Sequence, residues 1–125
     1  MSVSIYYAAT RPEPLTQAER FTVDSAIAKY AVEDQTDTYC ETGQGLNWES
    51  FCVYDPDAAA EPTTVFEGAT KLPDNSDDAM WTGIRHWCSL LTEIRNALPG
   101  ASWEVSVDDH DIVWDDVASV YDPSR

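Results

Sequence analysis

The stretch SDDAMWTGIRHWCSLLTEIRNALPGASWEVSVD, residues 76–108, decides the fold class of this chain. Its first part repeats apolar residues at intervals of three and four, the spacing of a helix that buries one face. Ser76 is a candidate N-cap for this helix, and Pro99-Gly100 ends it. The residues of the apolar face are Ile84, Trp87, Leu91, Ile94 and Leu98.

The second part of the stretch changes to a period of two. Trp103, Val105 and Val107 alternate with polar residues up to Asp108, which is typical of a strand with one buried side and one side in water. A helix followed by such a strand predicts an antiparallel sheet that helices cover on one face only.

The N-terminal part of the chain predicts another strand and helix of the same kind. Residues 2–8 alternate in hydrophobicity and indicate a strand. Thr16 and Glu19 have the spacing of a capping box, so we expect a helix to begin there and to end near Val32. The polar stretch from Glu33 to Gly45 follows without a predicted element.

The middle of the chain predicts a hairpin with a long loop. Residues 48–54 and 63–66 are rich in aromatic and β-preferring residues and flank the loop 55–61. The resulting order, βαββαβ, predicts a single α+β domain over residues 1–125 with a ferredoxin-like, open antiparallel sheet and two helices on one face. Residues 112–114 could add a C-terminal edge strand.

Composition limits the classes of function. The 125 residues are 43% hydrophobic, which is enough for a packed core despite a formal net charge of -16. No apolar run is long enough for a signal peptide or a membrane span. Cys40, Cys52 and Cys88 form no C-x-x-C pair, which predicts reduced thiols and a cytoplasmic protein.

The charge itself predicts the chemistry of a partner. A strongly negative surface repels nucleic acid and anionic membranes and attracts basic proteins. The acids are concentrated in two segments, 33–67 and 104–122, whereas most basic residues lie on the predicted helices. Acidic surfaces also serve solubility and adaptation to salt, and this second interpretation stays open.

Catalysis and metal binding have little support in the sequence. His110 lies among acids, but consecutive side chains on a turn point in different directions and no second histidine is near. His86 and Cys88 are two residues apart on a helix, so they do not share a face. No Walker, Rossmann, G-x-S-x-G or H-E-x-x-H motif is present. We therefore expect no catalytic residue, cofactor or metal.

The predicted partner-binding residues lie in the acidic segments. Trp114 is surrounded by carboxylates and could serve as an aromatic anchor for a basic partner, or it could close the edge of the core. The first choice for the interface is Asp108, Asp109, Asp111, Trp114, Asp115 and Asp116. The second choice is Glu41, Asp55 and Asp57.

With the strings GATKLP (residues 68–73) and DDHDIVWDD (residues 108–116), this small, acidic, tryptophan-rich chain resembles the immunity proteins of bacterial polymorphic and type VI secretion toxins. The resemblance is one of overall profile. It implies an antitoxin that binds one cognate toxin, often a nuclease or nucleotide-transferring enzyme, and covers its cationic active site. Two alternatives remain, a DNA mimic that inhibits a nucleic-acid-binding protein and a small metal-dependent enzyme.

Overall fold

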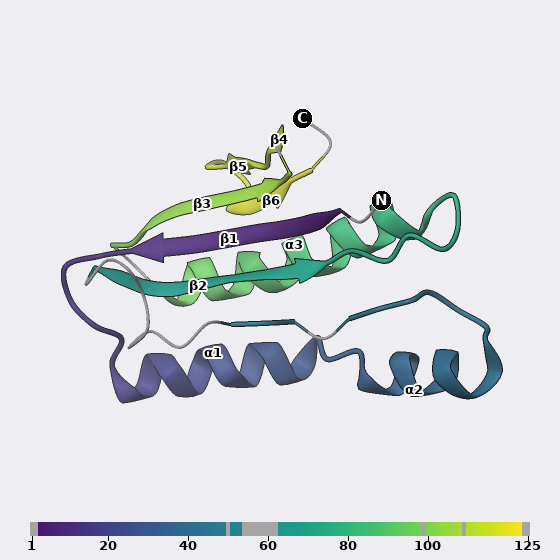
Figure 1. Cartoon of the computed structure of the whole chain (residues 1–125). Coiled ribbons are helices and arrows are strands. Elements are labelled where there is room, and N and C mark those ends of the chain that lie inside the picture. The colour runs from purple at the N-terminus through teal and green to yellow at the C-terminus, as the bar shows by residue number, and fades with distance from the viewer. Residues whose placement is uncertain (1–2, 50, 54–62, 99, 109, 124–125) are drawn as a thin grey trace.

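The computed structural model of the chain describes residues 3–49, 51–53, 63–98, 100–108 and 110–123. Within these residues the fold is mixed α+β, with a four-stranded antiparallel sheet, helices and a separate two-stranded hairpin (Figure 1). In chain order the elements are β1 (Ser4–Thr10), α1 (Gln17–Lys29), α2 (Glu33–Thr42), β2 (Thr64–Lys71), α3 (Ala79–Ala97), β3 (Ser102–Val107), β4 (His110–Asp111), β5 (Val113–Asp115) and β6 (Val120–Asp122).

Strand β1 is an inner strand of the sheet and pairs antiparallel with both β2 and β3. Its odd-numbered residues, Ile5, Tyr7 and Ala9, are buried, whereas Tyr6 between them is exposed. The predicted alternation is therefore confirmed, but the strand covers Ser4–Thr10 and not residues 2–8. A bulge at Val65 lets Val65 and Phe66 both be buried, because the register shifts between Ala9 and Thr10.

Helix α3 supplies much of the core beneath the sheet. The structure confirms its apolar face: Trp87, Leu91 and Ile94 are fully buried, and α3 runs behind β1 and β2 in Figure 1. The N-cap is Asp78, which makes no side-chain capping bond, so the prediction of Ser76 as N-cap was wrong by two residues. The chain leaves the helix through Gly100, whose positive φ of 79° suits a residue without a Cβ.

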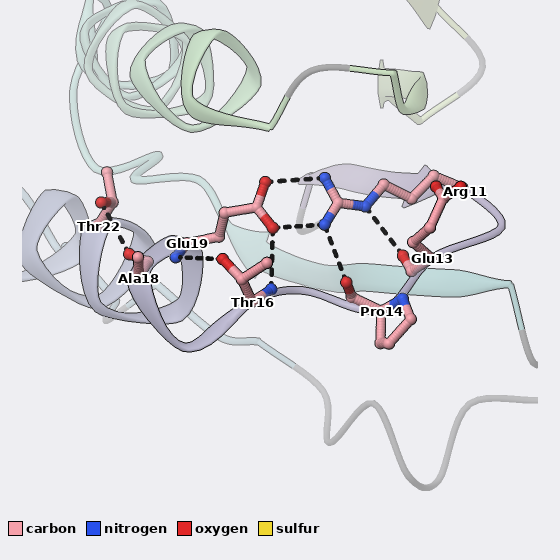
Figure 2. Close-up of polar contacts among 7 residues, drawn as sticks. All are labelled: Arg11, Glu13, Pro14, Thr16, Ala18, Glu19 and Thr22. Atoms are coloured by element: carbon pink, nitrogen blue, oxygen red, sulfur yellow. Dashed lines mark hydrogen bonds and ion pairs between the residues drawn. The ribbon is translucent and has the colours of Figure 1, made fainter.

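The start of α1 confirms the capping box. The Glu19 amide donates to the Thr16 hydroxyl (3.1 Å), and the Thr16 amide donates to the Glu19 carboxylate (2.9 Å). The same carboxylate forms an ion pair with Arg11, whose guanidinium also donates to the carbonyl oxygens of Glu13 (2.9 Å) and Pro14 (3.0 Å) (Figure 2). The two charged side chains are only 7% and 17% exposed. This network fixes the turn between β1 and α1.

Acidification should weaken this network. Hydrogen bonding from Arg11, and then from the Thr16 backbone, lowers the pKa of Glu19 to about 2. The unfolded chain, with a glutamate pKa of about 4.3, binds a proton first as the pH falls. The stabilisation is therefore complete above about pH 4.3 and is lost as the pH falls towards 2. We expect Glu19→Gln to lower the melting temperature at pH 7 and to have little effect at pH 2.

Thermal unfolding of both proteins between pH 7 and pH 2 checks this prediction. The matched control is Asp24→Asn, which removes the same charge from an exposed position on the same helix. An effect of Glu19→Gln that is the same at every pH would contradict the assignment of this carboxylate to the Arg11 network.

Helix α2 corrects the expectation that residues 33–45 form no element. Glu33 and Asp34 lie in its first turn, where the helix dipole favours negative charge. Gly43, with φ of 71°, accommodates the left-handed C-terminal residue, and its amide donates to the Tyr39 carbonyl (2.8 Å). None of the ten residues is buried, so α2 presents its side chains largely to solvent.

The expectation of a strand at residues 48–54 was also wrong for the part that the structure describes. Residues 46–49 and 51–53 have no strand structure, and the loop 55–61 with Tyr54 lies outside the described residues. Phe51 stacks on Tyr7 at 4.5 Å between ring centroids. The Tyr7 hydroxyl donates to the Cys52 carbonyl, and the Cys52 amide donates to Thr70 Oγ1 (3.1 Å). Residues 46–49 and 51–53, which we call the strap, lie across the buried face of β1 and β2.

The strand order β2-β1-β3-β4 differs from the ferredoxin-like order that the sequence predicted. β1 does lie between β2 and β3, but the described residues of the second predicted strand, 48, 49 and 51–53, form no strand. β4 instead extends the sheet beyond β3. The predicted edge strand at 112–114 also needs correction, because β5 pairs with β6 in a second sheet. That hairpin packs on α3, where the Tyr121 amide donates to Thr92 Oγ1 (3.1 Å).

Candidate interaction surface

Helices that cross a membrane and clusters that hold a metal are both missing from the described part of the chain. None of its helices combines the length and the apolar character that a bilayer requires. Across the same residues, no three His, Cys, Asp or Glu side chains come together as a metal would need.

Asp108 follows the end of β3, and β4 begins at His110. Asp108 has a positive φ of 50°, a conformation that aspartate tolerates better than most residues. Asp111 is exposed and pairs with Ser106 of β3, so the two side chains lie on the same face of the sheet. His110 pairs with Val107 and so lies on the opposite face. Asp109 is outside the described residues.

The next predicted interface residues lie on the β5–β6 hairpin. Trp114 is half-buried against the core, with the Arg95 guanidinium 4.1 Å from its ring centre. Asp115 accepts hydrogen bonds from the amides of Val117 (2.9 Å) and Ala118 (3.1 Å), so its carboxylate holds the turn of the hairpin. Asp116 is exposed. Trp114 therefore takes part in closing the core, and Asp116 is an exposed carboxylate of this group.

The second predicted group is separated from the first. Glu41 is exposed on α2, which lies at the opposite end of the molecule from β4 and the β5–β6 hairpin (Figure 1). Asp55 and Asp57 lie outside the described residues. The structure thus does not bring Glu41 together with the segment 108–116, and a single partner surface would have to use one group or the other.

His86 and Cys88 do not form a reactive pair. Cys88 is buried, and desolvation raises the pKa of its thiol to about 12, which suppresses the thiolate that nucleophilic attack requires. His86 packs edge-on against Trp87, and its Nε2 lies 2.7 Å from the Tyr30 carbonyl oxygen. Both side chains therefore take part in packing, and they do not contact each other as a nucleophile and a base would.

The hollow beside these residues has a volume of about 440 Å³ and lies between α3 and β6. Glu93 lines it and pairs with Lys29 of α1 at 2.9 Å, and this contact lowers the pKa of the Glu93 carboxyl. Thr92, also in the lining, donates to the Cys88 carbonyl (2.7 Å). Thr92 Oγ1 and Glu93 Oε1 are therefore engaged within the fold, whereas Glu93 Oε2 is buried without a hydrogen bond to the described residues.

The face of the sheet opposite α3 is a second acidic surface, which the sequence analysis did not predict as an interface. Tyr6 is 47% exposed in the middle of it. Strand register places Glu67 of β2 and Glu104 of β3 on either side of Ala8, in a row across three strands. Asp111 lies in the neighbouring row with Tyr6 and Ser106. The predicted alternation of β1 and β3 was a signal that could have located this surface.

The chain was compared with protein-family models, with curated proteins and with solved structures. None of the three comparisons finds a match. The open face of the sheet carries the carboxylates of Glu67, Glu104 and Asp111. These groups can attract and bind a cation, because they are exposed or half-exposed and project from a rigid sheet.

Proposed function

We propose that this protein binds a basic protein and neutralises it by covering its functional surface, in the manner of the small acidic immunity proteins that it resembles. The observation that carries the proposal is the imbalance of charge. The chain has 23 acidic and seven basic residues. Several of the basic residues are already paired with other side chains of the same chain, so they compensate little of the remaining acidic surface.

Three contacts show how the chain uses its own positive charges. Arg11 pairs with Glu19, Lys29 pairs with Glu93, and Arg95 stacks on Trp114. Each of them connects two elements or fixes a turn. The exposed acids of α2, of the open sheet face and of the β5–β6 hairpin are then free to act together on a partner at long range.

The mechanism that we propose has two stages. Attraction between the acidic protein and a cationic active site speeds the encounter above the roughly 10⁵–10⁶ M⁻¹s⁻¹ of neutral pairs. Close contacts by carboxylates and aromatic rings then slow dissociation. A toxin that binds phosphate-bearing substrates would offer such a site, and the carboxylates would take the place of the phosphates. Cys40 and Cys52 are exposed free thiols, which fits action in a reducing cytoplasm.

The test is affinity capture from extracts of the native cell, followed by inhibition of the captured protein. We expect one basic partner in equimolar amount, whose activity the protein abolishes at a ratio of one to one. The association rate should fall about tenfold or more between 50 mM and 500 mM salt. Failure to retain any basic protein, or capture without inhibition, would overturn the proposal.

A charge-reversal variant tests the acidic residues of the segment 108–116 in the same assay. Asp111→Lys combined with Asp116→Lys changes two exposed carboxylates and leaves the turn formed by Asp115 intact. We expect slower association and a weaker dependence on salt. Unchanged association would remove this group from the interface, whereas Glu41→Lys tests the α2 group independently.

A further inference from the structure

The open face of the sheet has an aromatic ring at its centre and small residues around it. Tyr6 is flanked by Ala69 of β2 and Ser106 of β3, and Ser4 and Ala8 precede and follow it on the same side of β1. No larger side chain in this set covers the ring, which explains why a central position in the sheet leaves it 47% exposed. Such an exposed aromatic residue on a rigid strand is typical of an interface anchor.

The small residues leave a hollow of about 240 Å³ beside this ring. Tyr6, Ala8 and Ser106 line it, together with Glu67 and Glu104 on opposite sides. The Cα atoms of the two glutamates are two strand spacings apart, about 10 Å. That separation leaves room for one planar guanidinium between their carboxylates, with the tyrosine ring at its side. The hollow thus combines the two groups to which arginine binds best, carboxylates and an aromatic face.

The charge of this face determines which class of partner fits it. Asp111 adds a third carboxylate at the β4 edge, and Lys71 lies on the same side of β2 but near its other end. A second copy of the chain would place like charges against one another, at a net charge of -16 for each copy. Nucleic acid and anionic lipid would be repelled for the same reason. A basic protein is the class that complements the surface.

We infer that this hollow is the docking site for an arginine side chain of the basic partner. Tyr6 stacks on the guanidinium, and Glu67 and Glu104 accept its hydrogen bonds. The inference rests on the proposed function, since it specifies where and by which residue the partner is recognised. The central contact then lies on β1, β2 and β3, whose positions are fixed by backbone pairing. Asp111 adds negative charge at the β4 edge of the same face.

The first experiment uses a defined probe, so it does not depend on the identity of the partner. A synthetic peptide with two arginines separated by glycines is titrated into the ¹⁵N-labelled protein. We expect amide shifts concentrated at residues 6–8, 67–69 and 104–106, and tighter binding than for the same peptide with lysines, because lysine lacks the planar fork. Shifts concentrated on α2 or on the β5–β6 hairpin would overturn the inference.

Matched variants separate recognition from general electrostatics. Glu67→Gln with Glu104→Gln should weaken binding of the arginine peptide about tenfold, since two exposed ion pairs are lost. Asp34→Asn with Asp37→Asn removes the same charge from exposed positions on α2, and we expect a change of less than about twofold. Tyr6→Ser should reduce the preference for arginine over lysine, because it removes the aromatic ring on which the guanidinium stacks. Equal weakening by both double variants would contradict a specific site.

The native partner then distinguishes failure of this inference from failure of the proposed function. If the captured partner binds the Glu67→Gln, Glu104→Gln protein as tightly as it binds the wild type, the docking site is wrong and the proposed function stands. If the wild type captures and inhibits no basic protein, the proposed function fails, whatever the peptide shows. Thermal unfolding of each variant confirms that the sheet is intact.

Discussion

Replacing Trp87 with alanine is expected to lower the free energy of unfolding by about 3–5 kcal/mol. The side chain is fully buried in the middle of α3. Its ring contacts Phe51 of the strap at 5.2 Å and Trp48 at 5.9 Å between centroids. The substitution therefore leaves a cavity between the helix and the strap as well as removing apolar surface. Chemical denaturation followed by circular dichroism measures the loss.

Trp81 offers the matched control on the same helix. It is 40% exposed, and the Arg85 guanidinium lies 5.8 Å from its ring centre. Trp81→Ala should cost less than about 1 kcal/mol, because most exposed substitutions have small effects. Similar losses from Trp87→Ala and Trp81→Ala would show that the strap does not pack on α3 as described.

Gly68→Ala is the second substitution for which we expect a large effect. A Cβ at this position would lie 2.1 Å from the Cys52 carbonyl oxygen and 2.6 Å from Cε2 of Tyr7. Both neighbours are held in place, since the Tyr7 hydroxyl bonds to the Cys52 carbonyl and to Thr70 Oγ1 (2.7 Å). The added methyl group must push the strap away from the sheet. We expect a loss of about 3 kcal/mol or more.

Hydrogen exchange distinguishes this local displacement from a general weakening. The Cys52 amide, which donates to Thr70 Oγ1, should lose its protection in Gly68→Ala before the amides of β1 do. Gly43→Ala is the control, because an added Cβ there meets nothing within 4 Å and only the φ of 71° is unfavourable, at about 1 kcal/mol. Equal losses from the two glycine substitutions would contradict the close contact at Gly68.

The elements that could be predicted from sequence are those in which one local signal agrees with burial. The apolar face of α3, the capping box at Thr16 and the alternation in β1 and β3 all satisfy this condition. In each case the side chains that specify the local structure also face the core or satisfy the backbone. Local preference and tertiary packing then give the same answer.

Two predictions from the sequence were wrong. An apolar segment was taken for a strand, and a polar segment was taken for a region without regular structure. Trp48 and Phe51 pack on α3 and β1 from an irregular strap, because a strap needs aromatic residues for burial as much as a strand does. Conversely, α2 has no buried face, and its signals were the acids of the first turn and Gly43 at the end. A search for apolar periodicity could not detect it.

The docking site that we infer shares its chemistry with the sequence-based prediction, which stays untested, but not its position. Charge alone indicated a basic partner, but adjacency in sequence favoured the segment 108–116. Pairing between strands that are distant in the chain is what brings Glu67 and Glu104 to the two sides of Ala8. Sequence spacing carries no information on such a row, because its members are contributed by three separate strands.

The inner position of β1 has a consequence for biosynthesis. When β1 leaves the ribosome, neither of its neighbours has been made, because β2 follows at residues 64–71 and β3 only at residues 102–107. Until then, the apolar side of a nascent β1 has no complete sheet to join. Closure of the sheet must therefore wait until residues 102–107 have been synthesised, which makes long-range pairing the slow event in folding and leaves Ile5 and Tyr7 accessible to chaperones during translation.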